Sequence, residues 1–367
     1  VEYDCNCSNN CEQDESNPPI PSDDFFSSII QNNNCNCFPP EPQLRTGRIL
    51  ISNPESFLII ENIESYVLET FEGIWKSELL LIADDQHKRT SSVGLEKSHI
   101  INSNKIYQNL KDNLHVACLY GSEFDRQESI DWYTQPDFTN RLIEKINNGL
   151  GIINYIGHGT SEFLADEDIL TIADIENISI DNNKLPIWIV GTCSFGNYLN
   201  ENCFAEELLN KGDAAIAIIS TTGNIGYSDN YSYLSTLFNN HLKNYLNNET
   251  LFEGIDYSKY RLGDLFYDTK INQLQNESYT FHLFGDPAIP LIFPKIDNLF
   301  TFNPSEEILI GVFNELPLNN EGEYTLKIQT QEKIKCYCDE ECEDMCSKQN
   351  CFLLNQCSSF SCDDDDN

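Results

Sequence analysis

The feature that most constrains the fold is a pair of short apolar runs, each followed by a turn that carries a reactive side chain. Residues 152–156 run into the turn GHG, which holds His158, and residues 187–190 run into GTC, which ends at Cys193. Continuous apolar runs of this length, bounded by Gly or Pro, are typical of buried strands in a parallel sheet. The carboxyl ends of such strands meet at one edge of the sheet. We therefore expect His158 and Cys193 to emerge side by side.

The pattern around these two runs alternates strands with helices. Apolar β-rich runs occur in GRILIS, SELLLIA, HVACLYG and AAIAIIS, and HLFGDPAIPLIF closes the series as an extended segment. The helices that we expect cover residues 55–71, 104–114, 139–148, 202–211, 231–245 and 261–274, and the segment Ile169–Ile175 is a helical crossing between the two central strands. Alternation of this kind indicates an α/β domain with a mostly parallel sheet flanked by helices. We assign this domain to residues 45–294.

The two ends of the chain differ from this domain in their cysteine content. The protein has 15 cysteines, and all but Cys118, Cys193 and Cys203 lie in residues 1–44 and 336–367. Disulfide bonds are the first interpretation, which implies an oxidising, extracytoplasmic location: secreted, on the cell surface or periplasmic. A thiolate metal cluster is the alternative, although the spacing of an ordinary zinc site is absent. We predict a cysteine-rich irregular leader (1–44), a small antiparallel β segment (295–335) and a cysteine-rich acidic tail (336–367).

The net charge of the chain argues against two classes of binding partner. The formal net charge is −37 at pH 7, which opposes binding to nucleic acid or to an anionic membrane surface. No apolar run reaches the roughly 18–20 residues that a membrane-spanning helix needs, so we expect no transmembrane segment.

A cysteine beside a histidine indicates nucleophilic chemistry. The neutral imidazole of His158 is the natural base for the Cys193 thiol. The backbone N–H groups of Gly159 and Cys193 stand where they could donate to a developing oxyanion. Asp85, or its neighbour Asp84, ends a third strand and could orient the histidine. Other interpretations stay open, because a lone cysteine at a strand end is often inert packing, and a pair of aspartates is often a turn or a calcium site.

The motifs YIGHGT, LPIWIVGTC, NCFAEELL and AIAIISTTG resemble those of the gingipain-type cysteine peptidases, family C25 of clan CD. The order from TGRILIS to HLFGDPAIPL, about Thr46–Phe293, is most similar to the PorU-like branch, the sortases of the type IX secretion system. The resemblance implies a caspase-like fold and a cysteine endopeptidase that works through a thioester acyl-enzyme. Hydrolysis of that intermediate releases an acid, whereas attack by an amine gives the transpeptidation of a sortase.

The resemblance also implies roles for individual residues. It makes Cys193 the nucleophile, His158 the base and Asp85 the orienting acid. It implies that Glu96, in the sequence Glu96-x-x-His99, lines a substrate pocket that prefers Lys or Arg. No cofactor is expected for catalysis on a protein or peptide substrate. A structural calcium ion is implied by the family, and the acidic loop that follows the histidine contains Asp166, Glu167 and Asp168, although no ligands can be assigned.

The chain departs from the family in two respects. It lacks the large β-rich regions that precede the catalytic unit in PorU-like proteins, and its cysteine-rich ends belong to no family pattern. The alternative function is therefore a non-catalytic extracellular structural or assembly protein, built on a peptidase-like fold and cross-linked through those ends. Self-association or contact with a secretion machine through the ends is the corresponding expectation for partners.

Overall fold

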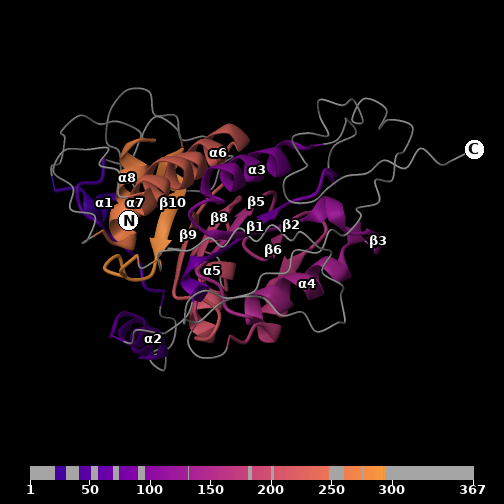
Figure 1. Ribbon diagram of the computed structural model, residues 1–367, viewed down its shortest axis with the longest axis horizontal. Helices are drawn as coiled ribbons and strands as arrows, with labels where there is room; N and C mark the ends of the chain where they lie inside the picture. The colour runs from indigo at the N-terminus through magenta and orange to yellow at the C-terminus, as the bar shows by residue number, and fades with distance from the viewer. Residues whose placement is uncertain are drawn as a thin grey trace, which may run out of the picture. The chain divides into compact units, whose positions relative to one another are not determined.

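A six-stranded sheet forms the centre of the computed structural model, with the strand order β10-β9-β8-β5-β1-β2 (Figure 1). The strands are β1 (Glu78–Ala83), β2 (His115–Tyr120), β5 (Ile152–Ile156), β8 (Ile187–Gly191), β9 (Ala217–Thr221) and β10 (Phe281–Phe284). All neighbours are parallel except β10, which pairs antiparallel to β9. The structure describes residues 21–29, 41–50, 57–68, 74–89, 96–130, 132–180, 184–199, 202–247, 260–273, 277–291 and 293.

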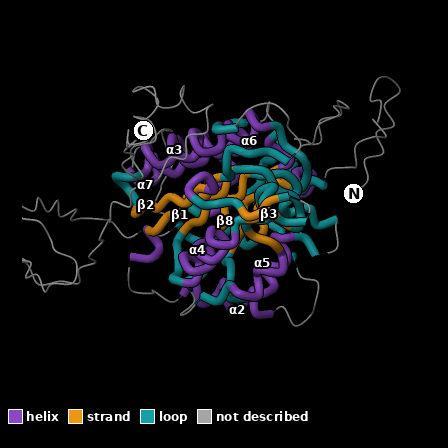
Figure 2. Tube along the Cα trace, turned by 90° about the vertical axis from the view of Figure 1, so that its right-hand side faces the viewer, coloured by secondary structure: helices purple, strands orange, loops and turns teal. Residues whose placement is uncertain are grey.

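Helices cover both faces of this sheet (Figures 1 and 2). One face carries α2 (Phe57–Leu68), α4 (Pro136–Asn147) and α5 (Phe204–Lys211), and the other carries α3 (Ser98–Leu110), α6 (Tyr227–Ser235), α7 (Lys243–Asn247) and α8 (Leu262–Ile271). A π-helical segment, Thr236–Leu242, joins α6 to α7. Because both faces are covered, β5, β8 and β9 are buried along their whole length, which explains their unbroken apolar sequences. The α/β fold with a mostly parallel sheet is thus confirmed.

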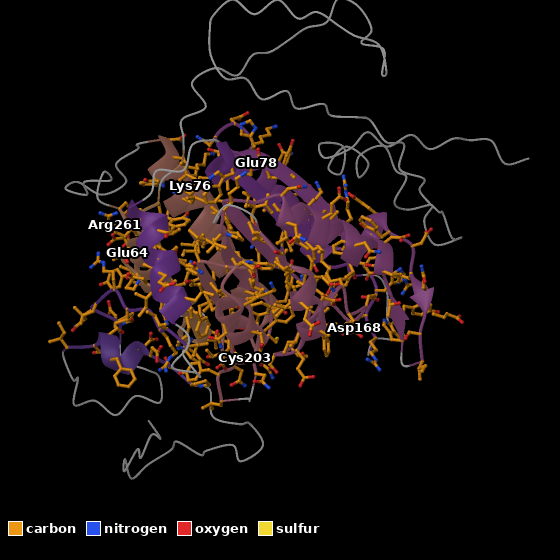
Figure 3. All side chains as sticks on the ribbon, turned by 90° about the horizontal axis from the view of Figure 1, so that it is seen from below. Glu64, Lys76, Glu78, Asp168, Cys203 and Arg261 are labelled. Atoms are coloured by element: carbon orange, nitrogen blue, oxygen red, sulfur yellow. The ribbon has the colours of Figure 1, made fainter. Side chains whose placement is uncertain are left out.

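Shorter elements complete the described part of the domain. The helix α1 (Asp24–Ser27) is a single turn, and 3-10 turns cover Ile74–Ser77, Gly121–Glu123, Ile172–Asn177 and Ser278–Thr280. Two small hairpins pair β3 (Gln127–Glu128) with β4 (Tyr133–Thr134), and β6 (Phe163–Leu164) with β7 (Leu170–Thr171). Side chains fill the space between the sheet and its helices (Figure 3), where Cys203, the residue before α5, is fully buried.

Two of the expected elements differ in the structure. The prediction of a helical crossing at Ile169–Ile175 is wrong, because this stretch contains the end of the β6–β7 hairpin and the start of a 3-10 turn. The cause is local, since Ala165 and Asp168 have φ angles of 62° and 52°, a left-handed conformation that closes the hairpin. The first expected strand, GRILIS, contributes only a bridge between Arg48 and Phe284 among its described residues.

Part of the leader packs on the domain. Asp24, in α1, is buried, and its Oδ1 lies 2.6 Å from Nζ of the equally buried Lys270 in α8. The adjacent Asp23 forms an ion pair with Arg48. The sequence predicts an irregular leader over residues 1–44, whereas these residues hold buried charged contacts to the domain. Most of the other leader residues lie outside the described residues, so their irregular structure stays a prediction.

Contacts divide the chain into two units between Pro294 and Lys295. The β segment and the cysteine-rich tail that the sequence predicts for residues 295–335 and 336–367 lie outside the described residues. Of the described cysteines, Cys118 is disulfide-bonded, and Cys193 and Cys203 are free thiols. Within the described ranges no helix is both long and apolar enough to cross a membrane.

Candidate active site

The strand register brings the two turns of the sequence pattern together. β5 and β8 pair in parallel with Ile156 opposite Gly191, so that His158 and Cys193 each follow two residues later. The turns also touch, because a Cβ atom added to Gly159 would lie 2.8 Å from Oγ1 of Thr192. The carboxyl ends of the two strands therefore place the histidine and the cysteine on neighbouring turns at one edge of the sheet.

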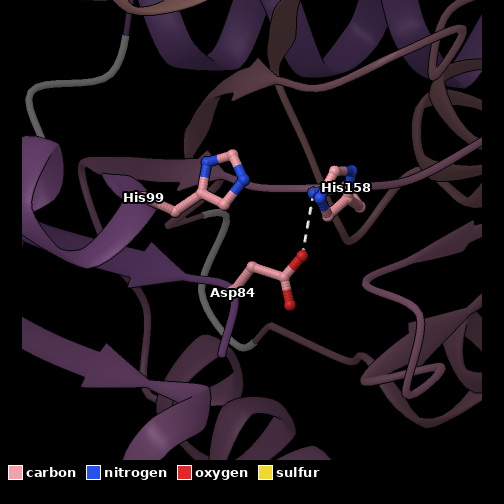
Figure 4. A group of neighbouring side chains, drawn as sticks. All are labelled: Asp84, His99 and His158. Carbon is pink, nitrogen blue, oxygen red and sulfur yellow. Dashed lines mark hydrogen bonds between the residues drawn. The ribbon is translucent and has the colours of Figure 1, made fainter. Parts of the chain in front are cut away.

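The third strand of this edge, β1, holds the histidine turn by its main chain. Asp84 directly follows β1, and its Oδ2 accepts a hydrogen bond from the backbone N–H of His158 at 2.9 Å (Figure 4). Its Oδ1 accepts one from the N–H of Asp85 at 2.8 Å. The phenol of Tyr155 donates to the carbonyl oxygen of His158 at 2.6 Å. Both backbone groups of the histidine are thus fixed by side chains.

Gly157 has no room for a side chain in this arrangement. A Cβ atom there would lie 2.3 Å from Oη of Tyr155 and 2.5 Å from Cβ of Asp84. These distances are far below van der Waals contact, so the turn needs glycine at this position.

The side chain of His158 meets a carboxylate from another part of the chain. Its Nε2 lies 2.8 Å from Oε2 of Glu96, which precedes α3. Burial opposes ionisation of Glu96, but the hydrogen bond with His158 and the nearby charges of His99, His158 and Lys88 outweigh it and lower the pKa of Glu96. An ionised Glu96 only accepts, so Nε2 of His158 carries the proton and Nδ1 holds the lone pair.

Asp85 does not have the position that the sequence analysis expects. Its Oδ1 accepts the backbone N–H of His87 at 2.6 Å, and its Oδ2 lies 3.5 Å from Nε2 of Gln135. Burial raises the pKa of Asp85 to about 6. The carboxylate on the His158 ring is Glu96, the residue that the resemblance assigns to a substrate pocket.

Cys193 lies on a tight turn after β8 and is partly exposed. Its Sγ is 3.8 Å from the carbonyl oxygen of Ile225, in the loop that follows β9. The next residue, Ser194, has a left-handed φ of 57°, and its N–H donates to the carbonyl of Gly223 at 2.9 Å. A non-glycine residue with this φ is uncommon and occurs often at functional sites. The thiol of Cys193 therefore sits at the start of a strained turn, against the loop that follows β9.

The hydrogen bonds around the histidine turn show which way the backbone N–H of Gly159 points, one of the two groups expected to bind an oxyanion. Thr160 donates to the carbonyl of Phe163, and Ala165 donates to the carbonyl of His158, each at 2.9 Å. Because these bonds flank Gly159 in its antiparallel bridge to Leu164, the Gly159 N–H points to the opposite side. In the described part of the chain, neither this N–H nor that of Cys193 donates to a protein acceptor.

A second histidine packs against the first. His99, in the first turn of α3, has a side chain only 4% exposed, and its ring stands edge-on to that of His158 with 5.2 Å between centroids. Burial, followed by the charge of His158, lowers the pKa of His99 to about 4. Within the described ranges neither ring nitrogen has a hydrogen-bond partner. The sequence analysis names His99 only as the second residue of the motif Glu96-x-x-His99 and does not predict its contact with His158, because the expected helix begins at residue 104.

Three buried carboxylates lie beneath the histidine turn. One oxygen each of Asp84, Asp85 and Glu167 lie within 4.8 Å of one another. Burial raises the pKa of Asp84 well above its ordinary value and that of Glu167 to about 7. Oε2 of Glu167 has no hydrogen-bond partner in the described part of the chain, and the nearest guanidinium nitrogen of Arg126 is 4.0 Å from Oε1. Three buried carboxylates with a single guanidinium beside them fit a hard cation such as Ca²⁺.

Comparisons with known proteins show which protein family this chain resembles. The sequence model described as Peptidase family C25 matches residues 5–292. Among curated proteins no significant match exists.

Three solved structures share the fold. The crystal structure of the Arg-specific cysteine proteinase gingipain R (RgpB) has a TM-score of 0.57 and 20% sequence identity, over 75% of this chain and 60% of that one. The complex of the pro- and mature domains of RgpB from Porphyromonas gingivalis gives 0.55 and 20%, over 74% and 60%. A structure described as a protease gives 0.50 and 14%, over 76% and 60%. The chain thus spans about 60% of the length of these structures.

Proposed function

Because this chain belongs to peptidase family C25, we propose that it is a cysteine peptidase with Cys193 as nucleophile and His158 as general base. The observation that carries the proposal is the hydrogen bond between His158 and Glu96, on the turn beside that of Cys193. A base oriented by an acid, next to a partly exposed free thiol, is the arrangement that nucleophilic catalysis requires.

The reaction follows from the two ring nitrogens of His158. Glu96 holds Nε2–H, so Nδ1 accepts the proton of the Cys193 thiol, and the thiolate attacks the carbonyl carbon of the substrate. The N–H groups of Gly159 and Cys193 donate to the resulting oxyanion. The imidazolium returns its proton to the leaving amine as the C–N bond breaks, which leaves a thioester on Cys193. Water, or an amine, then attacks the thioester and regenerates the thiol.

Two carboxylates share the support of the histidine in this proposal. Glu96 stabilises the imidazolium that forms when the thiol loses its proton, since opposite charges in contact favour the charged ring. Asp84 does not touch the ring and instead fixes the backbone of the turn. Orientation of this kind matters because small displacements of catalytic groups are costly to the rate.

We propose proteins or peptides as substrates, which is the class that the family acts on. The resemblance implies a preference for Lys or Arg only if Glu96 lines a substrate pocket. The Glu96 carboxylate instead contacts His158 and lies 3.9 Å from Nζ of Lys88, so this preference is not part of the proposal. Transpeptidation requires only that an amine reach the thioester before water does. Hydrolysis and transpeptidation are therefore separated by the products formed with and without an added amine nucleophile.

We further propose a structural calcium ion held by Asp84, Asp85 and Glu167. The support is the unpartnered Oε2 of the fully buried Glu167 beside two other buried carboxylates. Of the loop acids named from the sequence, Asp168 is exposed and Asp166 accepts the backbone N–H of Arg89 at 2.8 Å. A bound cation would compensate the charge of the three carboxylates and keep Asp84 ionised as an acceptor for the histidine turn.

An extracytoplasmic location remains part of the proposal. It rests on the cysteine content of the two ends, and the disulfide bond of Cys118 is consistent with it. Mass spectrometry without reductant would distinguish disulfides, which remove two hydrogens per bond, from a thiolate metal cluster, which adds metal mass.

The test of the catalytic proposal is covalent labelling. A panel of peptidyl acyloxymethyl ketones, offered to the full chain with calcium present, should label the protein at Cys193 and not label the Cys193→Ala variant. The His158→Ala variant should label at least tenfold more slowly, because its thiol lacks the base. Absence of labelling of the folded wild-type chain by every probe would reject the peptidase proposal and favour a non-catalytic protein cross-linked through its ends.

A further inference from the structure

His99 is an unusual buried histidine. Its side chain is 4% exposed, and neither Nδ1 nor Nε2 has a hydrogen-bond partner among the residues that the structure describes. Buried polar groups are nearly always paired, and an unpaired one in a native fold indicates a missing partner such as an ion. The nearest carboxylate oxygen, Oε1 of Glu96, lies 3.7 Å from Nε2, beyond hydrogen-bond distance.

The surroundings of His99 supply metal ligands rather than hydrogen-bond partners. One ligand atom each of Asp84, His99 and His158 lie within 4.8 Å of one another. Figure 4 shows the two imidazole rings next to each other above the Asp84 carboxylate, from three different elements of the chain. Two imidazoles and one carboxylate are a donor set that suits Zn²⁺ and similar borderline metals, and it differs from the all-oxygen set that Ca²⁺ prefers.

We propose that Asp84, His99 and His158 form an inhibitory site for a zinc-type divalent metal ion. Four ligands complete such a site, and Glu96, which already approaches both rings, is the nearest further carboxylate. Burial favours the neutral imidazole of His99, which is the form that binds a metal.

Metal binding at this site would stop the catalysis proposed above. A metal on Nδ1 of His158 occupies the lone pair that accepts the thiol proton. A metal on Nε2 displaces the proton that Glu96 holds and withdraws electrons from the ring, so that Nδ1 becomes a poor base. His158 is therefore lost as a base in both cases. This regulatory part rests on the proposed peptidase function, whereas the binding part does not.

The experiment measures binding and inhibition separately on the full chain without added Ca²⁺, because Asp84 belongs to both proposed metal sites and excess Ca²⁺ would compete for it. Co²⁺ is the probe for binding, because its visible absorption reports the ligands and Zn²⁺ displaces it. The variants are His99→Asn, Cys193→Ala and, as a matched surface control, His115→Asn at the opposite end of the sheet. Since thiolates of the terminal cysteines also bind Co²⁺, the reported quantity is the difference between each variant and the wild type.

The expected difference between wild type and His99→Asn is one Zn²⁺-displaceable Co²⁺ equivalent whose difference spectrum has no thiolate charge-transfer band, and Cys193→Ala and His115→Asn should bind as much Co²⁺ as the wild type. Zn²⁺ should reduce wild-type cleavage of a fluorogenic peptide at least tenfold, reversibly with a chelator. The rate of His99→Asn, relative to its own metal-free rate, should fall less than twofold. Binding that survives in His99→Asn, or that disappears in Cys193→Ala, would overturn the site, the second outcome assigning the metal to the thiol. If no peptide is cleaved, the Co²⁺ difference still decides the metal site.

Discussion

Nε2 of His158 lies 2.8 Å from Oε2 of Glu96, and the backbone N–H of the same histidine donates to Oδ2 of Asp84 at 2.9 Å. One residue is therefore held by two carboxylates from two parts of the chain. Glu96 is about one quarter exposed, whereas Asp84 is buried. The more exposed carboxylate, Glu96, contacts the imidazole ring, which changes its charge in the proposed reaction. The buried carboxylate, Asp84, contacts the backbone N–H, which does not.

We expect Glu96→Gln to lower kcat/KM by up to roughly 10⁴-fold, the effect of neutralising the acid that orients the catalytic histidine of a triad. The amide oxygen of glutamine can still accept Nε2–H, but it cannot stabilise the imidazolium by charge.

Asp85→Asn is the comparison for this variant. The Asp85 carboxylate contacts the backbone of His87 and the side chain of Gln135 rather than the His158 ring, so at a Ca²⁺ concentration that keeps the proposed calcium site filled its neutralisation should reduce kcat/KM less than tenfold. Kinetics of both variants at several pH values decide the matter. A severe defect in Asp85→Asn together with a mild one in Glu96→Gln would assign the orienting role to Asp85.

Gly157→Ala should destabilise the domain by roughly 1–3 kcal/mol, the usual cost of overpacking a tight site. The added Cβ would lie 2.3 Å from Oη of Tyr155 and 2.5 Å from Cβ of Asp84, and both atoms belong to buried side chains. Denaturant unfolding measures the loss. Gly226→Ala is the matched control, since the nearest atoms to its Cβ are 3.6 and 3.8 Å away. Equal unfolding free energies for the two variants would contradict the packing argument.

The sequence allowed much of the sheet to be predicted because its strands are short, apolar and bounded by Gly or Pro. It also placed His158 and Cys193 at strand ends, since the carboxyl edge of a parallel sheet follows from topology. It did not predict that α3 begins at Ser98, because the buried residues of its first half include His99, Asn102 and Asn104, which break the apolar period. Nor did it predict the partner of His158, since Glu96 lies just before α3, outside the strands and helices whose apolar period a sequence reveals.

Terbium offers a direct test of the calcium proposal, because Tb³⁺ replaces Ca²⁺ and emits when a nearby tryptophan is excited. Nε1 of Trp132 donates to Oε1 of Glu167 at 3.0 Å, so its indole adjoins the three carboxylates. We expect sensitised emission from the full chain that Ca²⁺ abolishes by competition. Glu167→Gln should remove both the emission and the rise in melting temperature with Ca²⁺.

Trp132→Phe separates binding from detection. This variant should lose the sensitised emission but keep the Ca²⁺-dependent rise in melting temperature, because the indole is the sensitiser and not a ligand. If Glu167→Gln retains both signals at wild-type strength, the cation lies elsewhere in the chain.

The stability of the domain should fall in mild acid because of His282 in β10. The side chain is buried, Nδ1 lies 3.0 Å from the carbonyl of Thr280, and Nε2 accepts the N–H of Asp23 at 2.9 Å, so the neutral ring fits its partners. Burial, with the charge of Lys270, lowers its pKa to about 3. Since the ordinary value is near 6.5, the stabilisation is fully present above pH 6.5 and is lost as pH falls toward 3. At pH 4.5 the loss amounts to roughly 2–3 kcal/mol.

The measurement is the free energy of unfolding of wild type and His282→Gln between pH 4.5 and 7.5. Other groups also titrate in this range, including the neighbouring Asp23 and Asp24, so the difference between the two proteins is the informative quantity. Near pH 7 the wild type should be the more stable protein, because glutamine fits the site less well than the neutral ring. Its advantage should shrink steadily as pH falls, because only the wild type has an imidazole at this position, which takes up a proton when the chain unfolds. A difference that is independent of pH would show that His282 is protonated in the folded state as readily as in the unfolded one, and that the buried contacts to Asp23 and Thr280 do not select the neutral ring.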